Sequence, residues 1–252
     1  MTGATDSAGV PWEGRSFPET APSSDDGSPD PRLTEAVAAF RSGELAFPQL
    51  IVALHEVRLL VPLIAVRGDE GVGAHGQLVD KTQELSIVTV EGPDGRAVLP
   101  AFSGVESMRR WNPDARPIPI QAPRVAIAAA SEGTELIAID PASENGFVLR
   151  RPAFRALALG EEWIPSYADA EVRSVLRRAI EAEPAVSDLD TVAGDPEARL
   201  AGPELQIRLA VAPGLDAAAL EELVARLATR WAAEAIVAER VDSLGVGIRP
   251  AS

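Results

Sequence analysis

The sequence predicts an α+β protein: a mixed sheet that contains antiparallel strands, with helices packed on it, followed by a smaller α/β domain. The first observation is that residues 85–90 and 96–102 are apolar runs joined by Gly-Pro-Asp-Gly, turn chemistry that links antiparallel strands. Residues 136–140 and 146–149 form a second pair of this kind. The third observation is that residues 204–248 read as a strand, a helix and a strand.

The composition is ordinary for a soluble globular protein, with 46% hydrophobic and 24% charged residues in a chain of 252. The net charge of -15 repels phosphate groups, and the basic residues are scattered instead of gathered in one stripe, so we expect neither nucleic acid nor an acidic membrane surface as a partner. The N-terminus lacks the basic and apolar regions of a signal peptide, and the longest apolar run, residues 59–66, is too short to cross a bilayer. We therefore expect a cytoplasmic protein.

Four segments are expected along the chain. Residues 1–30 carry four prolines among Ser, Gly and acidic residues, with too few large apolar groups to offset the entropy of ordering, and are predicted to be disordered. Residues 31–160 form an N-terminal domain. Residues 161–168, which include EEWIPSY, read as a linker, and residues 169–252 form a C-terminal domain.

Capping and turn residues set the bounds of the elements in the N-terminal domain. Asp30-Pro31 begins a helix that Gly43 stops. Pro62 removes one ladder donor from its strand, so we place that strand at an edge or on a bulge. The expected elements are helices at 31–42 and after Pro48, a strand at 59–66, a loop at 67–83, strands at 85–90 and 96–102, helices at 105–111 and 123–131, strands at 136–140 and 146–149, and a helix at 152–159.

The C-terminal domain begins with clean helical spacing over residues 172–180. A strand at 204–211, a helix at 216–231 and a strand at about 238–248 follow. Asp216 is a natural N-cap for the long helix, whose apolar residues form one stripe.

No motif predicts a cofactor. GVGAHG, residues 71–76, matches the dinucleotide-binding pattern, but no helix with an apolar face follows it, so a pyrophosphate would lack the helix N-terminus it needs. We expect a surface loop there. His55 and His75 have no ligand partner three or four residues away, which argues against a metal site.

No motif predicts catalysis either. The chain has no cysteine, no serine in a nucleophile elbow and no P-loop, so no residue is assigned a catalytic role. The carboxylate pairs Asp188 with Asp190 and Glu161 with Glu162 could serve as acid and base, but in an acidic chain we expect them to hydrate the surface.

The most unusual stretch is MRRWNPDARPIP, which sets Arg109, Arg110 and Trp111 beside a Pro-rich exit. Arginine and tryptophan are enriched at binding hot spots, and this pairing suits an acidic or aromatic partner. The alternative is a core tryptophan with hydrated arginines. Asp140, at a strand end before Pro141, is a fourth candidate for partner binding, although Asp-Pro also begins turns.

A family resemblance centres on the same stretch. The run GRAVLPAFSGVESMRRWNPDARPIPIQAPRVAIAAASEGTELIAIDP resembles the N-terminal domain of the SseB-like family, known in actinobacteria and enterobacteria and linked by name to enhanced serine sensitivity. The shared pattern is a hairpin ending in Phe102-Ser103, a short helix with tryptophan, a Pro-rich link, a helix, and a strand ending in Asp140-Pro141. The resemblance covers about residues 33–160, and residues 202–252 look like the smaller C-terminal domain of the family.

The resemblance implies an α+β domain with antiparallel strands and no agreed catalytic residues. We therefore expect a non-enzymatic protein-interaction or accessory module that has a protein partner of unknown identity and no cofactor. The alternative is the binding or sensing of a small ligand, an amino acid or another metabolite, in the cleft between the two domains. An enzyme comes third.

Overall fold

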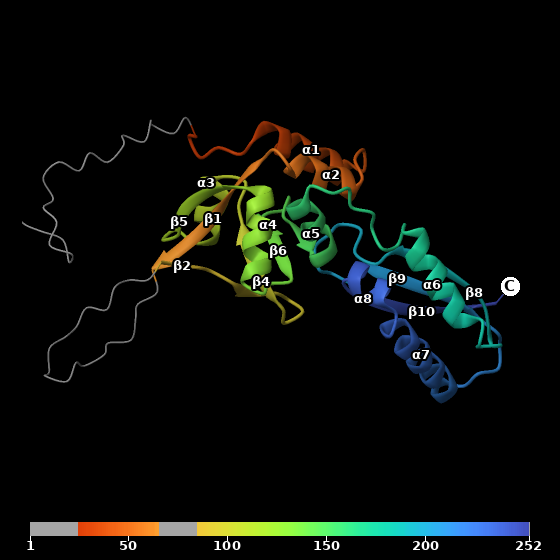
Figure 1. Cartoon of the computed structure of the whole chain (residues 1–252). Coiled ribbons are helices and arrows are strands. Elements are labelled where there is room, and N and C mark those ends of the chain that lie inside the picture. The colour runs from red at the N-terminus through yellow and green to blue at the C-terminus, as the bar shows by residue number, and fades with distance from the viewer. Residues whose placement is uncertain (1–24, 66–84, 252) are drawn as a thin grey trace, which may run out of the picture.

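The protein has the predicted α+β fold, and separate hydrophobic cores divide it into two units that lie end to end (Figure 1). The computed structural model describes residues 25–65 and 85–251. Most of the predicted tail, and the loop with GVGAHG and His75, lie outside the described residues. We call residues 25–160 the N-terminal unit, residues 161–168 the link and residues 169–251 the C-terminal unit.

The helices begin where the sequence provides a cap. The side chain of Asp30 accepts a hydrogen bond from the backbone of Arg32 at 2.9 Å, and Asp169 and Asp216 cap later helices in the same way. In chain order the elements are α1 (Pro31–Ser42), α2 (Phe47–Leu54), β1 (Arg58–Ala65), β2 (Leu85–Ile87), β3 (Val90–Glu91), β4 (Ala97–Ala101), α3 (Val105–Trp111), β5 (Arg116–Gln121), α4 (Ala122–Ser131), β6 (Leu136–Ile139), β7 (Phe147–Arg150), α5 (Arg151–Leu159), α6 (Ala170–Ile180), β8 (Val186–Ala193), β9 (Leu205–Val211), α7 (Ala217–Ala232), α8 (Ala235–Arg240) and β10 (Leu244–Pro250).

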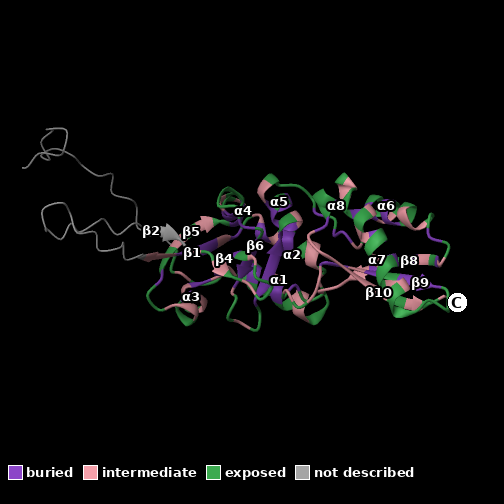
Figure 2. Cartoon of the chain, turned by 90° about the horizontal axis from the view of Figure 1, so that it is seen from below, coloured by how far each residue is buried: buried purple, intermediate pink, exposed green. Residues whose placement is uncertain are grey.

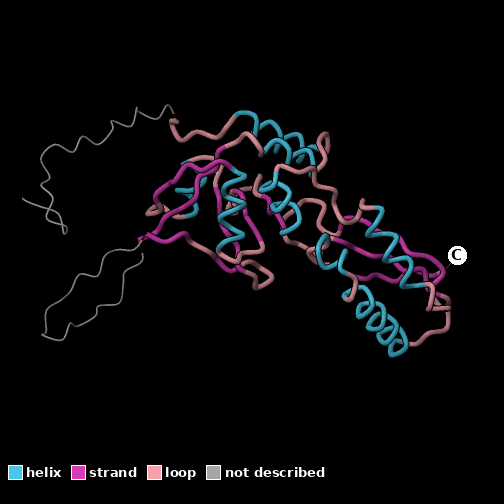
Figure 3. Tube along the Cα trace, viewed as in Figure 1, coloured by secondary structure: helices cyan, strands magenta, loops and turns pink. Residues whose placement is uncertain are grey.

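A four-stranded mixed sheet in the order β3-β4-β6-β7 forms the centre of the N-terminal unit. β4 and β6 are parallel, whereas β3 with β4 and β6 with β7 are antiparallel pairs. The second predicted hairpin is present, but the strand expected at residues 85–90 is divided: residues 85–87 form β2, which pairs with β1, and β3 pairs with β4 across the Gly-Pro-Asp-Gly turn. Helices α4 and α5 pack on one face of this sheet (Figure 3). Leu200 of the C-terminal unit packs on the other face. Every residue of β6 and β7 is therefore buried.

A second sheet in the order β2-β1-β5 corrects the placement of Pro62. β1 lies in the middle of this sheet, not at an edge. An N–H at position 62 would point to the side of β1 on which Leu60 bonds Phe102, and β2 pairs only with the residues that follow Pro62. Pro62 is therefore tolerated, because neither neighbour on that side offers it a ladder hydrogen bond. β5 was read as an irregular Pro-rich link. It is an edge strand whose two prolines direct their nitrogens away from β1.

The C-terminal unit is a three-stranded sheet in the order β10-β9-β8, with α6 and α7 packed together beside it. Its strand β8 was missed, because Asp188 and Asp190 interrupt the apolar pattern. The segment expected as one strand from residue 238 is divided: α8 ends at Arg240, and β10 begins at Leu244. Figure 2 shows the buried residues gathered in the strands and inward helix faces of both units.

Candidate functional site

A recess opens where the parallel strands β4 and β6 end. Open sheets with parallel strands commonly bind ligands at the carboxyl ends of those strands. The recess has a volume of about 200 Å³, and α1, α3 and the loop after β6 surround it. Its lining residues are Pro29, Leu33, Thr34, Val37, Ser103, Glu106, Ser107, Arg110, Ile139, Asp140, Ser143, Asn145 and Phe147.

Asp140 lines this recess in a left-handed backbone conformation, with φ of 48°. Its Oδ1 accepts a hydrogen bond of 3.0 Å from the backbone N–H of Ser103. Gly146 passes so close that a Cβ there would lie 2.4 Å from the Asp140 carbonyl oxygen. A strained conformation at a non-glycine residue costs free energy and is found most often at functional sites.

Arg110 lies on the rim of the same recess, on α3. Its side chain is 66% exposed and lies 3.3 Å from the equally exposed carboxylate of Glu106. The neighbouring Arg109 is exposed and makes no ion pair within the described part of the chain. The fold thus brings Arg110 and Asp140 to one recess, and it leaves Arg109 beside that recess on the outer surface.

Trp111 takes a different position. Its ring lies 5.3 Å from that of Phe102, centroid to centroid, and packs on the cluster of Leu60, Phe102 and Met108. The side chain is only partly exposed. Of the four residues that the sequence singled out, Trp111 is therefore the one built into the hydrophobic packing.

The other candidates from the sequence do not gather at this recess. His55 follows α2, and among the residues that the structure describes no cluster of three or more potential ligands could hold a metal ion. Asp188 is bound by Arg249 at 2.9 Å, while Asp190 is exposed. No helix in the described ranges is long and apolar enough to span a membrane.

Buried charges join the two units at a junction formed by Arg96, Arg150, Asp195 and Asp242. Arg150 lies 3.0 Å from Asp242 and 2.7 Å from Asp195, and Arg96 lies 2.9 Å from Asp242. The side chains of Arg150, Asp195 and Asp242 are 7%, 2% and 1% exposed. Burial raises the pKa of Asp242, but hydrogen bonds from the two arginines outweigh it and leave that pKa below its ordinary value.

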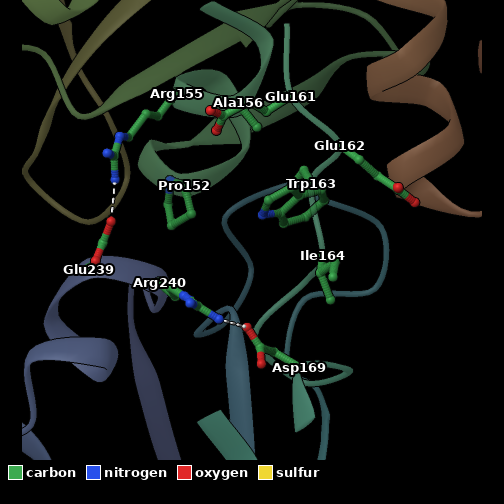
Figure 4. Close-up of a pocket in the computed structure, with 10 residues that line it drawn as sticks. All are labelled: Pro152, Arg155, Ala156, Glu161, Glu162, Trp163, Ile164, Asp169, Glu239 and Arg240. Atoms are coloured by element: carbon green, nitrogen blue, oxygen red, sulfur yellow. Dashed lines mark hydrogen bonds and ion pairs between the residues drawn. The ribbon is translucent and has the colours of Figure 1, made fainter. Parts of the chain in front are cut away.

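A second recess, the inter-unit pocket, is lined by residues of both units and of the link (Figure 4). Its volume is about 340 Å³, and α5, the link and α8 contribute its walls. Arg155 of the N-terminal unit bonds Glu239 of the C-terminal unit at 2.8 Å, so this ion pair lies across the pocket. Arg240 bonds Asp169 at 3.0 Å within the C-terminal unit. The sequence analysis gave a cleft between the two domains as an alternative ligand site, but it named none of these four residues as part of that site.

Trp163 lies in this pocket and is 9% exposed. Its indole Nε1 has no hydrogen-bond partner in the described structure. A buried donor without an acceptor costs about 1 to 3 kcal/mol, and native proteins contain few of them. The predicted linker is therefore not a free tether, since Trp163 and Ser166 are both buried in it.

Comparison with known proteins gives one match. Residues 33–156 match the family model described as SseB protein N-terminal domain. No curated protein and no solved structure matches the chain. The matched range includes α3, the recess and Asp140, and it ends within α5.

Proposed function

The chain belongs to the SseB-like family through the N-terminal domain at residues 33–156, and from this premise we propose that it is a cytoplasmic, non-enzymatic protein-interaction module. The partner binds the exposed face of α3 together with the recess at the ends of β4 and β6. The contact residues are Arg109, Arg110 and Asp140, with Trp111 as their packed support.

The observation that carries this proposal is a pair of weakly neutralised arginines on a strongly acidic chain. The net charge is -15, yet Arg109 has no ion pair in the described structure and Arg110 has only an exposed one. Exposed ion pairs contribute about 0 to 1 kcal/mol, so both guanidinium groups are available to a partner. Guanidinium groups bind carboxylates in bidentate geometry, which favours an acidic segment of the partner.

The recess beside the arginines fits one side chain of that segment. Ligand pockets for drug-sized molecules measure about 300 to 1,000 Å³, and the recess, at about 200 Å³, is smaller. Its floor is apolar, from Leu33, Val37 and Phe147. Oδ2 of Asp140 makes no hydrogen bond in the described structure, so it can accept one from the backbone of the partner.

The experiment that tests this function is capture of partners by the full chain, followed by binding measurements with the purified partner. The test variant is Arg109→Glu with Arg110→Glu. The matched control is Arg124→Glu with Arg178→Glu, because these arginines are also exposed and the change in net charge is the same. We expect all three proteins to have the same circular dichroism and melting temperature, and only the test variant to lose binding. Equal binding by both variants would place the interaction surface elsewhere.

Small-ligand binding is the second candidate function, favoured by the inter-unit pocket and the unpartnered indole N–H of Trp163. A ligand that binds only the folded state raises the melting temperature by an amount that grows with the logarithm of its concentration above Kd. A thermal-shift screen of metabolites, serine included, tests this candidate. A dose-dependent rise that Trp163→Phe abolishes supports it, and a screen in which no metabolite changes the melting temperature argues against it.

A further inference from the structure

The inter-unit pocket has the size and position of a small-molecule site. Its volume of about 340 Å³ lies within the about 300 to 1,000 Å³ that ligand sites occupy, and such sites are common between domains. Pro152 and Ala156 of α5 form an apolar wall. Ile164 of the link lines the pocket and is 57% exposed. A ligand that covered this side chain would remove apolar surface from water, which favours binding.

The indole of Trp163 is fixed in this pocket with an unused donor. Its ring packs edge to face on Phe47, with 5.6 Å between ring centroids. In Figure 4 the indole nitrogen is on the edge of the ring that faces Pro152 and Arg240. Nε1 finds no acceptor among the described protein atoms, and an indole can only donate, so the donor is open to an acceptor atom of a water or of a bound molecule.

The charges of the pocket favour a cation as the second group. The guanidinium groups of Arg155 and Arg240 are occupied by Glu239 and Asp169. Glu161 also lines the pocket and makes no ion pair within the described ranges. Glu162 points away from the other labelled side chains in Figure 4. The exposed carboxylate of Glu161 is therefore the uncompensated charge on the lining of the pocket.

We propose that the inter-unit pocket binds a small molecule that carries both a primary ammonium group and an acceptor oxygen. The oxygen accepts a hydrogen bond from Nε1 of Trp163, and the ammonium group lies against Glu161. The carbon atoms between them contact Pro152, Ala156 and Ile164. This inference names the ligand class for the second candidate function and is independent of the interaction surface on α3.

Occupancy of this pocket also bears on the arrangement of the two units. One wall belongs to α5 and the link, and the other belongs to α8 and to Asp169 at the start of α6. A molecule that contacts both walls stabilises the arrangement of the units in which Arg155 meets Glu239.

Glycinamide tests the ligand class because it is a very small molecule with both groups. Acetamide has only the acceptor oxygen, and ethylammonium has only the cation. Each is titrated into the full chain, and the indole N–H resonances are followed in ¹H–¹⁵N correlation spectra. Trp163→Phe assigns the resonance of Trp163 by its disappearance. The Nε1 group of Trp231, which donates to the carbonyl of Leu176 at 3.3 Å, gives a resonance that should not move and serves as an internal control.

We expect glycinamide to shift the Trp163 indole resonance in a saturable way and to bind more tightly than acetamide, whereas ethylammonium leaves that resonance in place. Glu161→Gln should raise the Kd for glycinamide by about two- to fivefold, the effect of an exposed charge pair. An indole resonance that glycinamide does not move would overturn the proposal. Equal affinities for glycinamide and acetamide would overturn the ammonium assignment. If a metabolite raises the melting temperature while glycinamide has no effect, ligand binding stands and only the proposed class fails.

Discussion

The backbone N–H of Ser103 donates a hydrogen bond of 3.0 Å to Oδ1 of Asp140, and this bond ties together the ends of the parallel strands β4 and β6. Asp140 does so from a left-handed conformation with φ of 48°. This side chain lines the recess, and its second carboxylate oxygen stays free of protein partners in the described structure.

Substitutions of Asp140 should separate conformation from charge. Asn tolerates the left-handed region and keeps an oxygen acceptor, so Asp140→Asn should change the free energy of unfolding by less than about 1 kcal/mol. Asp140→Val places a β-branched residue at positive φ and removes the acceptor, which should cost about 2 to 4 kcal/mol. Urea denaturation measures both. Equal stability of the two variants would show that the conformation of Asp140 is not constrained by the fold.

The junction between the units should be sensitive to the loss of its central cation. Arg150→Met leaves Asp195 buried without its ion-pair partner and Asp242 with Arg96 alone, and breaking a buried pair in this way costs about 3 to 5 kcal/mol. The control is Arg155→Met, which removes an exposed ion pair with Glu239 and should change stability little. The two melting temperatures give the comparison, and similar small losses would contradict the account of the junction.

The pH dependence of stability should have two components of opposite sign. The pKa of Asp242 is lowered in the folded state, so the stability it contributes is present above its unfolded pKa of 3.8 and is lost as the pH falls further. Burial raises the pKa of Glu204, so this residue makes the protein less stable as the pH rises from 4.5 through its folded pKa. Urea unfolding of wild type and Glu204→Gln across this range checks the second component. If Glu204→Gln keeps the wild-type slope above pH 4.5, Glu204 is not the group responsible.

Two tryptophans offer a matched test of the unpartnered indole donor. Trp163→Phe removes an N–H group that has no acceptor in the described structure, whereas Trp231→Phe removes one that bonds Leu176. The loss of stability should therefore be larger for Trp231→Phe, by about 1 kcal/mol. Thermal and urea unfolding in the absence of any ligand supply the values. A larger loss in Trp163→Phe would mean that its N–H is already satisfied in the free protein.

The sequence predicted the elements whose signals are local. Asp30 and Asp216 cap helices, and Gly-Pro-Asp-Gly joins β3 to β4, because caps and turns depend on residues a few positions apart. β5 and β8 were missed, since prolines in one and aspartates in the other conceal the alternation of apolar residues. Their pairing with β1 and β9 supplies the missing information.

The candidate sites depend on contacts between distant parts of the chain. Arg110 and Asp140 share a recess only because β4 and β6 run parallel, with Ala101 opposite Ile139. Both were singled out as separate residues, and nothing in their spacing joined them. The inter-unit pocket arises from Trp163 meeting α8, which begins about 70 residues later, and no local pattern could have shown it.

The association rate of the captured partner is the most direct test of the proposed interaction surface. Charges at the edge of an interface act mainly on the association rate constant and on its dependence on salt. For wild type we expect this constant to fall steeply as the ionic strength rises. For Arg109→Glu with Arg110→Glu we expect it to be lower by about tenfold or more at low salt and nearly insensitive to salt. The control with Arg124→Glu and Arg178→Glu should follow the wild type, and identical rate constants for the two double variants at every salt concentration would contradict the account.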